Sequence, residues 1–75
     1  MKTLIFFTTT GCHLCEQAKL VVASCPSVRL QEVDIACDEQ LIDRYGLRIP
    51  VLRRPDLNEL NWPFSAEDVI QFIGS

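Results

Sequence analysis

A short apolar run, a polar loop and a Cys-x-x-Cys pair follow one another at the start of the chain. Residues 4–7 are continuously apolar and residues 8–11 are polar or glycine, a pattern typical of a strand covered on both faces of a sheet. From Cys12 to Cys25 the apolar residues recur at the spacing of one helical face, and Pro26 ends this pattern. The sequence therefore predicts a central strand that delivers two cysteines to the start of a helix.

The same residues also have features of an export signal, because Lys2 precedes the apolar run and small residues precede Cys12. A secretory signal, however, needs an apolar core of about 7 to 15 residues, and the run here ends at Phe7. A lipoprotein signal would carry an aliphatic residue where Thr9 stands. We therefore expect the segment to remain part of the folded protein.

The chain has 75 residues and a hydrophobic fraction of 48%, which is enough apolar material for one small core, so we expect a single domain over residues 1–75. Its net charge of −3 argues against a broad surface for nucleic acid or anionic lipid. Strong apolar periodicity is unlike a secreted disulfide scaffold, so the four cysteines favour a cytoplasmic protein. We expect a monomer without a nucleic-acid or membrane partner.

The middle of the chain predicts a second strand and a second helix. Residues 28–35 are rich in strand-forming side chains, but their alternation slips midway, which predicts an uncertain register or a bulge near Gln31. Asp38 is placed to cap a short helix. Gly46 follows this helix, at a position where helices commonly end on a left-handed residue.

The last third of the chain predicts a hairpin and a closing helix. Residues 51–54 and 57–62 read as two short strands joined by a turn, which should pair antiparallel. Ser65 and Asp68 have the spacing of a capping box, and an apolar helical face follows them. The predicted order, β-α-β-α-β-β-α, gives an α/β fold with a mixed four-stranded sheet and three helices.

The cysteine pair lies at the predicted junction of strand and helix. Unpaired backbone N–H groups and the helix dipole stabilise a thiolate there, and can lower the pKa of a cysteine from about 8.5 to roughly 3.5 to 7.5. We expect Cys12 to be the nucleophile. Cys15, one helical turn further on, is placed to resolve a mixed disulfide at Cys12. His13 would favour the thiolate when protonated, or is simply an exposed histidine beside the pair.

Other roles for the cysteines fit the spacing less well. Haem attachment needs a histidine directly after the second cysteine, where this chain has Glu16. A zinc site would need a second close pair, whereas Cys25 and Cys37 are far apart and His13 is the only histidine, so we expect no metal. Cys25 is expected to be a plain buried thiol, and Cys37 is not expected to be catalytic.

The stretch TTTGCHLC after a buried strand, the later tripeptide Ile49-Pro50-Val51 and the closing helix together resemble the thioredoxin fold in its minimal form. The resemblance covers nearly the whole chain and is greatest to the short glutaredoxin-like proteins of bacteria. It implies that Pro50 is a cis-proline that packs against the cysteine pair and leaves the backbone of Ile49 free for an extended substrate or glutathione. It also implies glutathione as a possible reductant, with no tightly bound cofactor.

Three differences from glutaredoxins bear on the redox potential and on the use of glutathione. His13 and Leu14 stand between the cysteines, where glutaredoxins usually have Pro-Tyr. Residues 62–65, Trp-Pro-Phe-Ser, stand where glutaredoxins usually have a glycine pair that holds a glutathione carboxylate. Threonines replace the usual basic residue before the first cysteine, and Arg48 is the candidate to substitute for it near the thiolate.

These patterns predict a thiol–disulfide oxidoreductase that acts on a disulfide-containing protein or on a glutathione mixed disulfide. Two alternatives stay open: a binding or redox-sensing module of the same fold with little turnover, and an iron–sulfur cluster carrier in which a dimer uses Cys12 of each chain. The site residues of the main hypothesis are Cys12 and Cys15 as the catalytic pair, Ile49 and Pro50 in the substrate groove, and His13 and Arg48 as groups that tune the thiolate.

Overall fold

The computed structural model describes residues 2–74, and four strands form one mixed sheet in the order β2-β1-β3-β4. Within these residues, no helix is long and apolar enough to cross a membrane. The predicted order of elements and the minimal thioredoxin fold are confirmed. The elements are β1 (Lys2–Thr8), α1 (His13–Ala23), β2 (Val28–Asp34), the 3-10 turn η1 (Ile35–Cys37), α2 (Glu39–Tyr45), β3 (Val51–Arg53), β4 (Glu59–Asn61) and α3 (Ala66–Gly74).

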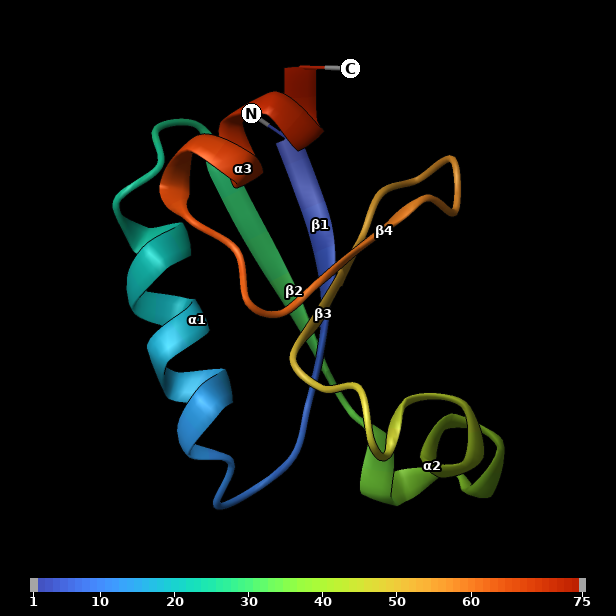
Figure 1. Cartoon of the computed structure of the whole chain (residues 1–75). Helices are drawn as coiled ribbons and strands as arrows, with labels where there is room; N and C mark the ends of the chain where they lie inside the picture. The colour runs from blue at the N-terminus through green and yellow to red at the C-terminus, as the bar shows by residue number, and fades with distance from the viewer. Residues whose placement is uncertain (1, 75) are drawn as a thin grey trace.

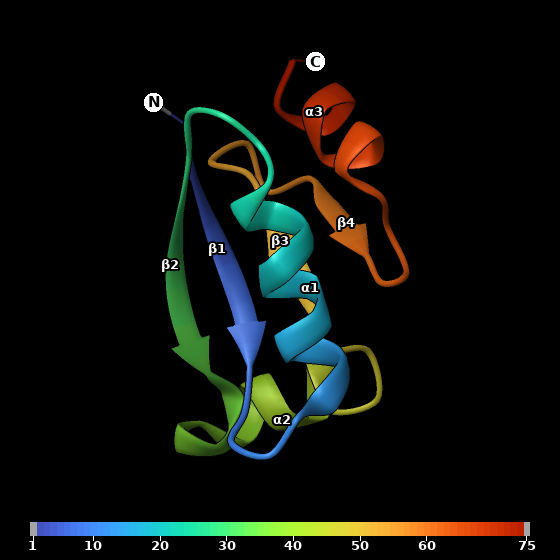
Figure 2. The same cartoon turned by 90° about the vertical axis from the view of Figure 1, so that its left-hand side faces the viewer.

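The sheet separates two unequal layers of helices. Figure 1 shows α1 and α3 on one face of the sheet and α2 on the other, and Figure 2 shows α1 in front of β3 and beside β1. β1 is internal, parallel to β2 and antiparallel to β3. Leu4 and Phe6 are buried in the cluster that includes α1 and α3, whereas Phe7 stacks on Tyr45 of α2 with ring centroids 4.1 Å apart. The prediction of a central strand covered on both faces is confirmed.

β2 shows no bulge, and the sequence expectation near Gln31 is wrong. The strand pairs with β1 in unbroken parallel register over its whole length and ends at Asp34, where η1 begins. The apolar alternation slips because β2 lies at the edge of the sheet, where Glu32 forms an ion pair with Lys19 of α1 at 2.8 Å instead of entering the core. The break in the pattern is therefore a polar contact and not an extra residue.

α2 begins as predicted and ends differently. The Gln40 N–H donates to the Asp38 carboxylate at 2.8 Å, which is the expected cap. Gly46, however, has a φ of −54°, so the predicted left-handed ending is wrong. Glycine is required for space, because a Cβ at this position would lie 2.5 Å from the carbonyl oxygen of Ile42.

The closing part of the chain forms the predicted hairpin and helix, with strands shorter than expected. β3 and β4 pair antiparallel. α3 follows a capping box in which the Asp68 N–H donates to Ser65 Oγ at 3.1 Å and the Ser65 N–H donates to the Asp68 carboxylate at 2.9 Å. Phe64 and Val69, which flank this box, are both buried in the core cluster below α3.

Candidate active site

Cys12 is the N-cap residue of α1. Its backbone is extended, with φ −86° and ψ 103°, and its Sγ accepts the N–H of Cys15 at 3.1 Å. Gly11, directly before it, has a φ of +79°, a left-handed angle that glycine adopts without strain. The turn through Gly11 therefore carries the chain from the end of β1 to the helix start. Cys12 occupies the place predicted from the sequence, next to the unpaired N–H groups of the first turn.

Cys12 and Cys15 form a disulfide, with their Cα atoms 5.2 Å apart. Cys15 is 2% exposed and belongs to the core cluster, whereas Cys12 is half-buried at its margin. An incoming thiol or thiolate therefore reaches Cys12 more readily than Cys15. This asymmetry is the one required by a nucleophile and a resolving thiol.

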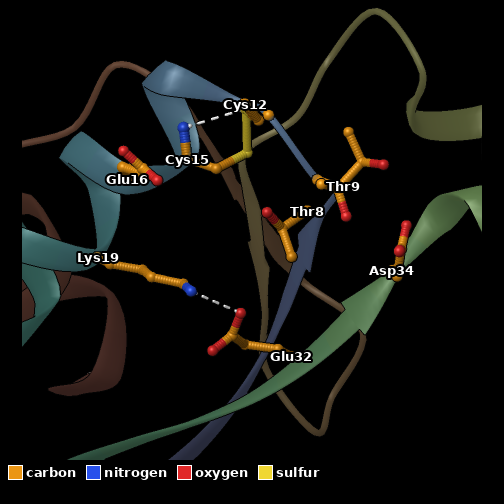
Figure 3. A pocket seen from close by; sticks show the side chains of 10 residues that line it. Thr8, Thr9, Cys12, Cys15, Glu16, Lys19, Glu32 and Asp34 are labelled. Atoms are coloured by element: carbon orange, nitrogen blue, oxygen red, sulfur yellow. Dashed lines mark hydrogen bonds and ion pairs between the residues drawn. A yellow bond between two sulfur atoms is a disulfide. The ribbon is translucent and has the colours of Figure 1, made fainter.

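A cavity of about 390 Å³ lies beside the disulfide, between the first turns of α1 and the ends of β1 and β2. Figure 3 shows Glu16 and Lys19 on the helix side and Glu32 and Asp34 on the side of β2, with the disulfide at one end. Three carboxylates and one ammonium group thus line a cavity that includes the reactive sulfurs. The complete lining is Thr8, Thr9, Thr10, Gly11, Cys12, Cys15, Glu16, Lys19, Glu32 and Asp34.

His13 and Leu14, the residues between the cysteines, both point to solvent. His13 is the first residue of α1 and is exposed, and Leu14 is 46% exposed. An apolar side chain therefore lies open beside the disulfide. The influence of His13 on the thiolate stays a prediction.

Pro50 is buried and follows a cis peptide bond, as the resemblance implies. Ile49 and Cys12 both contact the core cluster between the sheet and α1. The backbone of Ile49 is only partly available, because its N–H donates to the Tyr45 carbonyl at 3.0 Å. The expectation that the backbone of Ile49 is free is therefore wrong for its N–H group. The groove role of Ile49 and Pro50 stays a prediction.

Arg48, the second residue predicted to tune the thiolate, binds other groups. Its guanidinium donates to Glu59 at 2.8 Å and to Asn61 at 3.0 Å. Burial alone would raise the pKa of the Glu59 carboxyl, but hydrogen bonds from Tyr45 and Arg48 outweigh it and hold that pKa below its usual value. Burial, together with the hydrogen bond to Glu59, raises the pKa of Tyr45. Arg48 thus neutralises Glu59, and its effect on Cys12 stays a prediction.

The other cysteines lie apart from the disulfide. Cys25 is buried, with Sγ 3.5 Å from the Val21 carbonyl and 3.7 Å from the Ala66 carbonyl, as expected for a buried thiol. Cys37 ends η1 and is exposed.

Two features were not anticipated from the sequence: the position of two carboxylates of β2 in the cavity and the packing of the residues at 62–65. Glu32 and Asp34 line the cavity because β2 pairs with β1 in unbroken register. The bulge expected near Gln31 did not allow this position to be predicted. Trp62 precedes a second cis-proline and packs edge-on against Phe64, with ring centroids 5.0 Å apart. The aromatic pair at 62–65 was visible in the sequence as the replacement of the expected glycines.

A family model described as the glutaredoxin-like domain (DUF836) matches residues 3–74. The chain belongs to this glutaredoxin-like family. The crystal structure of protein XcR50 from X. campestris is similar to it at 38% identity and a TM-score of 0.89, with 95% of each chain covered. Protein Ne2328 from Nitrosomonas europaea is similar at 29% identity and a TM-score of 0.73, covering 95% of this chain and 89% of that one. Among curated proteins, no significant match is found.

The family model thus establishes a glutaredoxin-like protein. In its structure, Cys12 and Cys15 form a disulfide. The solution structure of XcR50 agrees, at 38% identity and a TM-score of 0.87, covering 99% of this chain and 94% of that one.

Proposed function

We propose that this glutaredoxin-like protein is a thiol–disulfide oxidoreductase. The observation that carries the proposal is the position of Cys12 at the N-cap of α1, where its sulfur accepts the Cys15 N–H and is bonded to the sulfur of Cys15, a residue that is 2% exposed. A thiolate at this position is stabilised by the same N–H and by the positive end of the helix dipole. The chain thus combines a stabilised, accessible sulfur with a protected resolving sulfur.

The proposed reaction begins from the reduced pair. The Cys12 thiolate attacks one sulfur of a substrate disulfide, which forms a mixed disulfide with Cys12 and releases the first substrate thiol. The Cys15 thiolate then attacks the sulfur of Cys12, which closes the intramolecular disulfide and releases the second thiol. Two electrons pass from the cysteine pair to the substrate. Two external thiols return the pair to the reduced state and leave as one disulfide.

The substrate in this proposal is a disulfide-containing protein or a glutathione mixed disulfide, and glutathione is the reductant to test first. Residues 62–65 lack the glycine pair that glutaredoxins use for a glutathione carboxylate, and Trp62 packs there against Phe64. Reduction by glutathione would therefore depend mainly on the sulfur chemistry at Cys12. We further propose a monomeric protein of the cytoplasm, where external thiols keep the pair in turnover.

Trapping the mixed disulfide tests the proposal. The Cys15→Ser variant, incubated with a glutathionylated peptide, should accumulate a glutathione adduct at Cys12 that mass spectrometry locates. The Cys12→Ser variant should form no glutathione adduct at position 12 and should lose turnover. The matched control is Cys37→Ser, which removes an exposed thiol outside the cavity and should keep the activity of the parent protein.

Two further measurements separate the alternatives. A pair that is reduced once but does not turn over would indicate a redox-sensing or binding module and would overturn the enzymatic proposal. Anaerobic reconstitution with iron and sulfide that yields a coloured dimer, lost in Cys12→Ser, would favour a cluster carrier instead.

A further inference from the structure

Four of the five arginines of the chain gather on the sheet face that bears α2. Residues paired across adjacent strands share a face, so Arg53 of β3 lies with Ile5 of β1 and Glu59 of β4. By the same register, Arg29 of β2 lies beside Thr3 on this face. α2 covers one end of the face only, as Figures 1 and 2 show, and Arg29 is exposed beyond it. We call this surface the arginine face, defined by Arg29, Arg44, Arg48 and Arg53.

Three of these side chains are held by aromatic rings. The guanidinium carbons of Arg44 and Arg48 lie 5.4 Å and 5.2 Å from the ring centroid of Tyr45, and that of Arg53 lies 5.0 Å from the ring of Phe7. Such cation–π contacts fix a long side chain in one place. A partner that binds these groups therefore orders them at little further cost in conformational entropy.

Among the described residues, one carboxylate pairs with the arginines of this face. Glu59 pairs with Arg48 at 2.8 Å and contacts Arg44 at 4.0 Å, and within residues 2–74 no other carboxylate pairs with the four arginines. The Glu59 side chain is 14% exposed, whereas Arg44 is 61% and Arg48 is 39% exposed. The single negative charge thus lies beneath the positive ones. Four of the seven basic residues thus lie on one face of a chain whose net charge is −3.

Two features favour an acidic protein segment over a nucleic acid as the partner. Single-stranded nucleic acids bind by stacking their bases on exposed aromatic side chains. The rings on this face belong to Phe7 and Tyr45, which are 2% and 0% exposed. A long polyanion would also extend past the arginine face, because the largest extent of the molecule is only 31 Å. It would then be repelled by the rest of the chain, which is predominantly acidic. A short acidic segment can contact the arginines without covering that acidic remainder.

We propose that the arginine face is a docking surface for an acidic segment of a partner protein. Carboxylates of the partner accept hydrogen bonds from the guanidinium groups of this face. Arg29 and Arg44 donate most readily, because Arg29 has no ion-pair partner within the described residues and Arg44 is 61% exposed. The face lies opposite the α1 and α3 layer, so docking there leaves the cavity beside the disulfide open. This inference does not depend on the proposed redox activity.

The test is a titration of the ¹⁵N-labelled protein with an end-blocked hexaglutamate peptide at low ionic strength, where exposed charges are weakly screened. Chemical-shift changes should concentrate on the arginine face and spare α3. The double variant Arg29→Gln, Arg44→Gln should bind about fivefold more weakly, the sum expected for two exposed charge pairs. Its matched control is Lys2→Gln, Lys19→Gln, which removes the same charge from strand and helix positions on the other side of the sheet and should bind like the parent protein.

Every other outcome overturns the inference. If the two double variants bound hexaglutamate equally weakly, the binding would depend on net charge alone. Chemical-shift changes spread over the whole surface would lead to the same conclusion. A thymidine oligonucleotide with an equal number of charges that binds more tightly than hexaglutamate would make nucleic acid the partner. Absence of any hexaglutamate binding would remove the docking surface. Both variants replace exposed side chains, and a spectrum as dispersed as that of the parent protein verifies the fold.

Discussion

Gly46 shows how a single residue can be required for a reason that the sequence does not reveal. Its backbone is right-handed, but a Cβ there would lie 2.5 Å from the carbonyl oxygen of Ile42. We expect Gly46→Ala to destabilise the protein by about 1 to 3 kcal/mol, as overpacking usually does. Urea unfolding would measure this change. Gly74→Ala is the control, because a Cβ there meets nothing within 4 Å, and equal stability of the two variants would contradict the steric argument.

Asp56 illustrates the effect of one charged neighbour on a carboxyl group. Hydrogen bonds from the Arg54 guanidinium, at 3.0 Å and 2.7 Å, lower the pKa of Asp56 from 3.8 to about 2. A lowered pKa in the folded state stabilises the protein above pH 4 and loses this contribution as the pH falls from about 4 to about 2. We expect Arg54→Gln to raise the pKa of Asp56 toward 3.8 in an NMR titration. An unchanged value would show that Asn58, which also donates to this carboxylate, is sufficient.

At the scale of elements, the capping box of α3 should control the stability of the closing helix. Ser65→Ala and Asp68→Ala each remove one of two reciprocal hydrogen bonds, so we expect a loss of about 1 kcal/mol for each in thermal or urea unfolding. Glu67→Ala removes a charge from the same helical turn without removing either bond, and should cost less. Equal losses in all three variants would contradict the capping account, because Glu67 contributes to neither of the two bonds.

The elements also show what the sequence could and could not predict. The strand before Cys12, the helix after it and the capping box were predictable because each is encoded by local periodicity or spacing. The register of β2 was not, because a polar residue at an edge strand looks like a slip in the pattern until its partner Lys19 is known. The contacts of Arg48 with Glu59 were not predictable either, because they depend on how β3 and β4 pair in the hairpin.

At the scale of the whole molecule, the charges around the disulfide should discriminate among substrates of the proposed reaction. The cavity is lined by Glu16, Glu32 and Asp34 but only one cation, Lys19, which already pairs with Glu32. We expect the dicationic disulfide cystamine to react roughly tenfold faster than dianionic dithiodipropionate, after each rate is divided by its rate with free dithiothreitol. Stopped-flow kinetics of the reduced protein would measure the ratio.

The dependence of the cystamine-to-dithiodipropionate rate ratio on single substitutions and on salt tests whether the cavity charges cause it. Glu16→Gln should reduce the ratio, and so should added salt, because exposed charges are screened. Glu67→Gln on α3, outside the cavity lining, is the matched control and should leave the ratio unchanged. A ratio near one in the parent protein would show that the cavity charges do not reach the reacting sulfurs, even if the protein exchanges disulfides rapidly.

The central claim is that the start of α1 activates the sulfur of Cys12, and the pH dependence of its alkylation tests this most directly. The reduced protein is treated with iodoacetamide over a range of pH, and modification is followed separately at each of the four cysteines by mass spectrometry. The N-cap position and the Cys15 N–H predict an apparent pKa for Cys12 well below the value of about 8.5 of a free cysteine. Exposed Cys37 is the internal reference. A value for Cys12 at or above that of Cys37 would contradict the account.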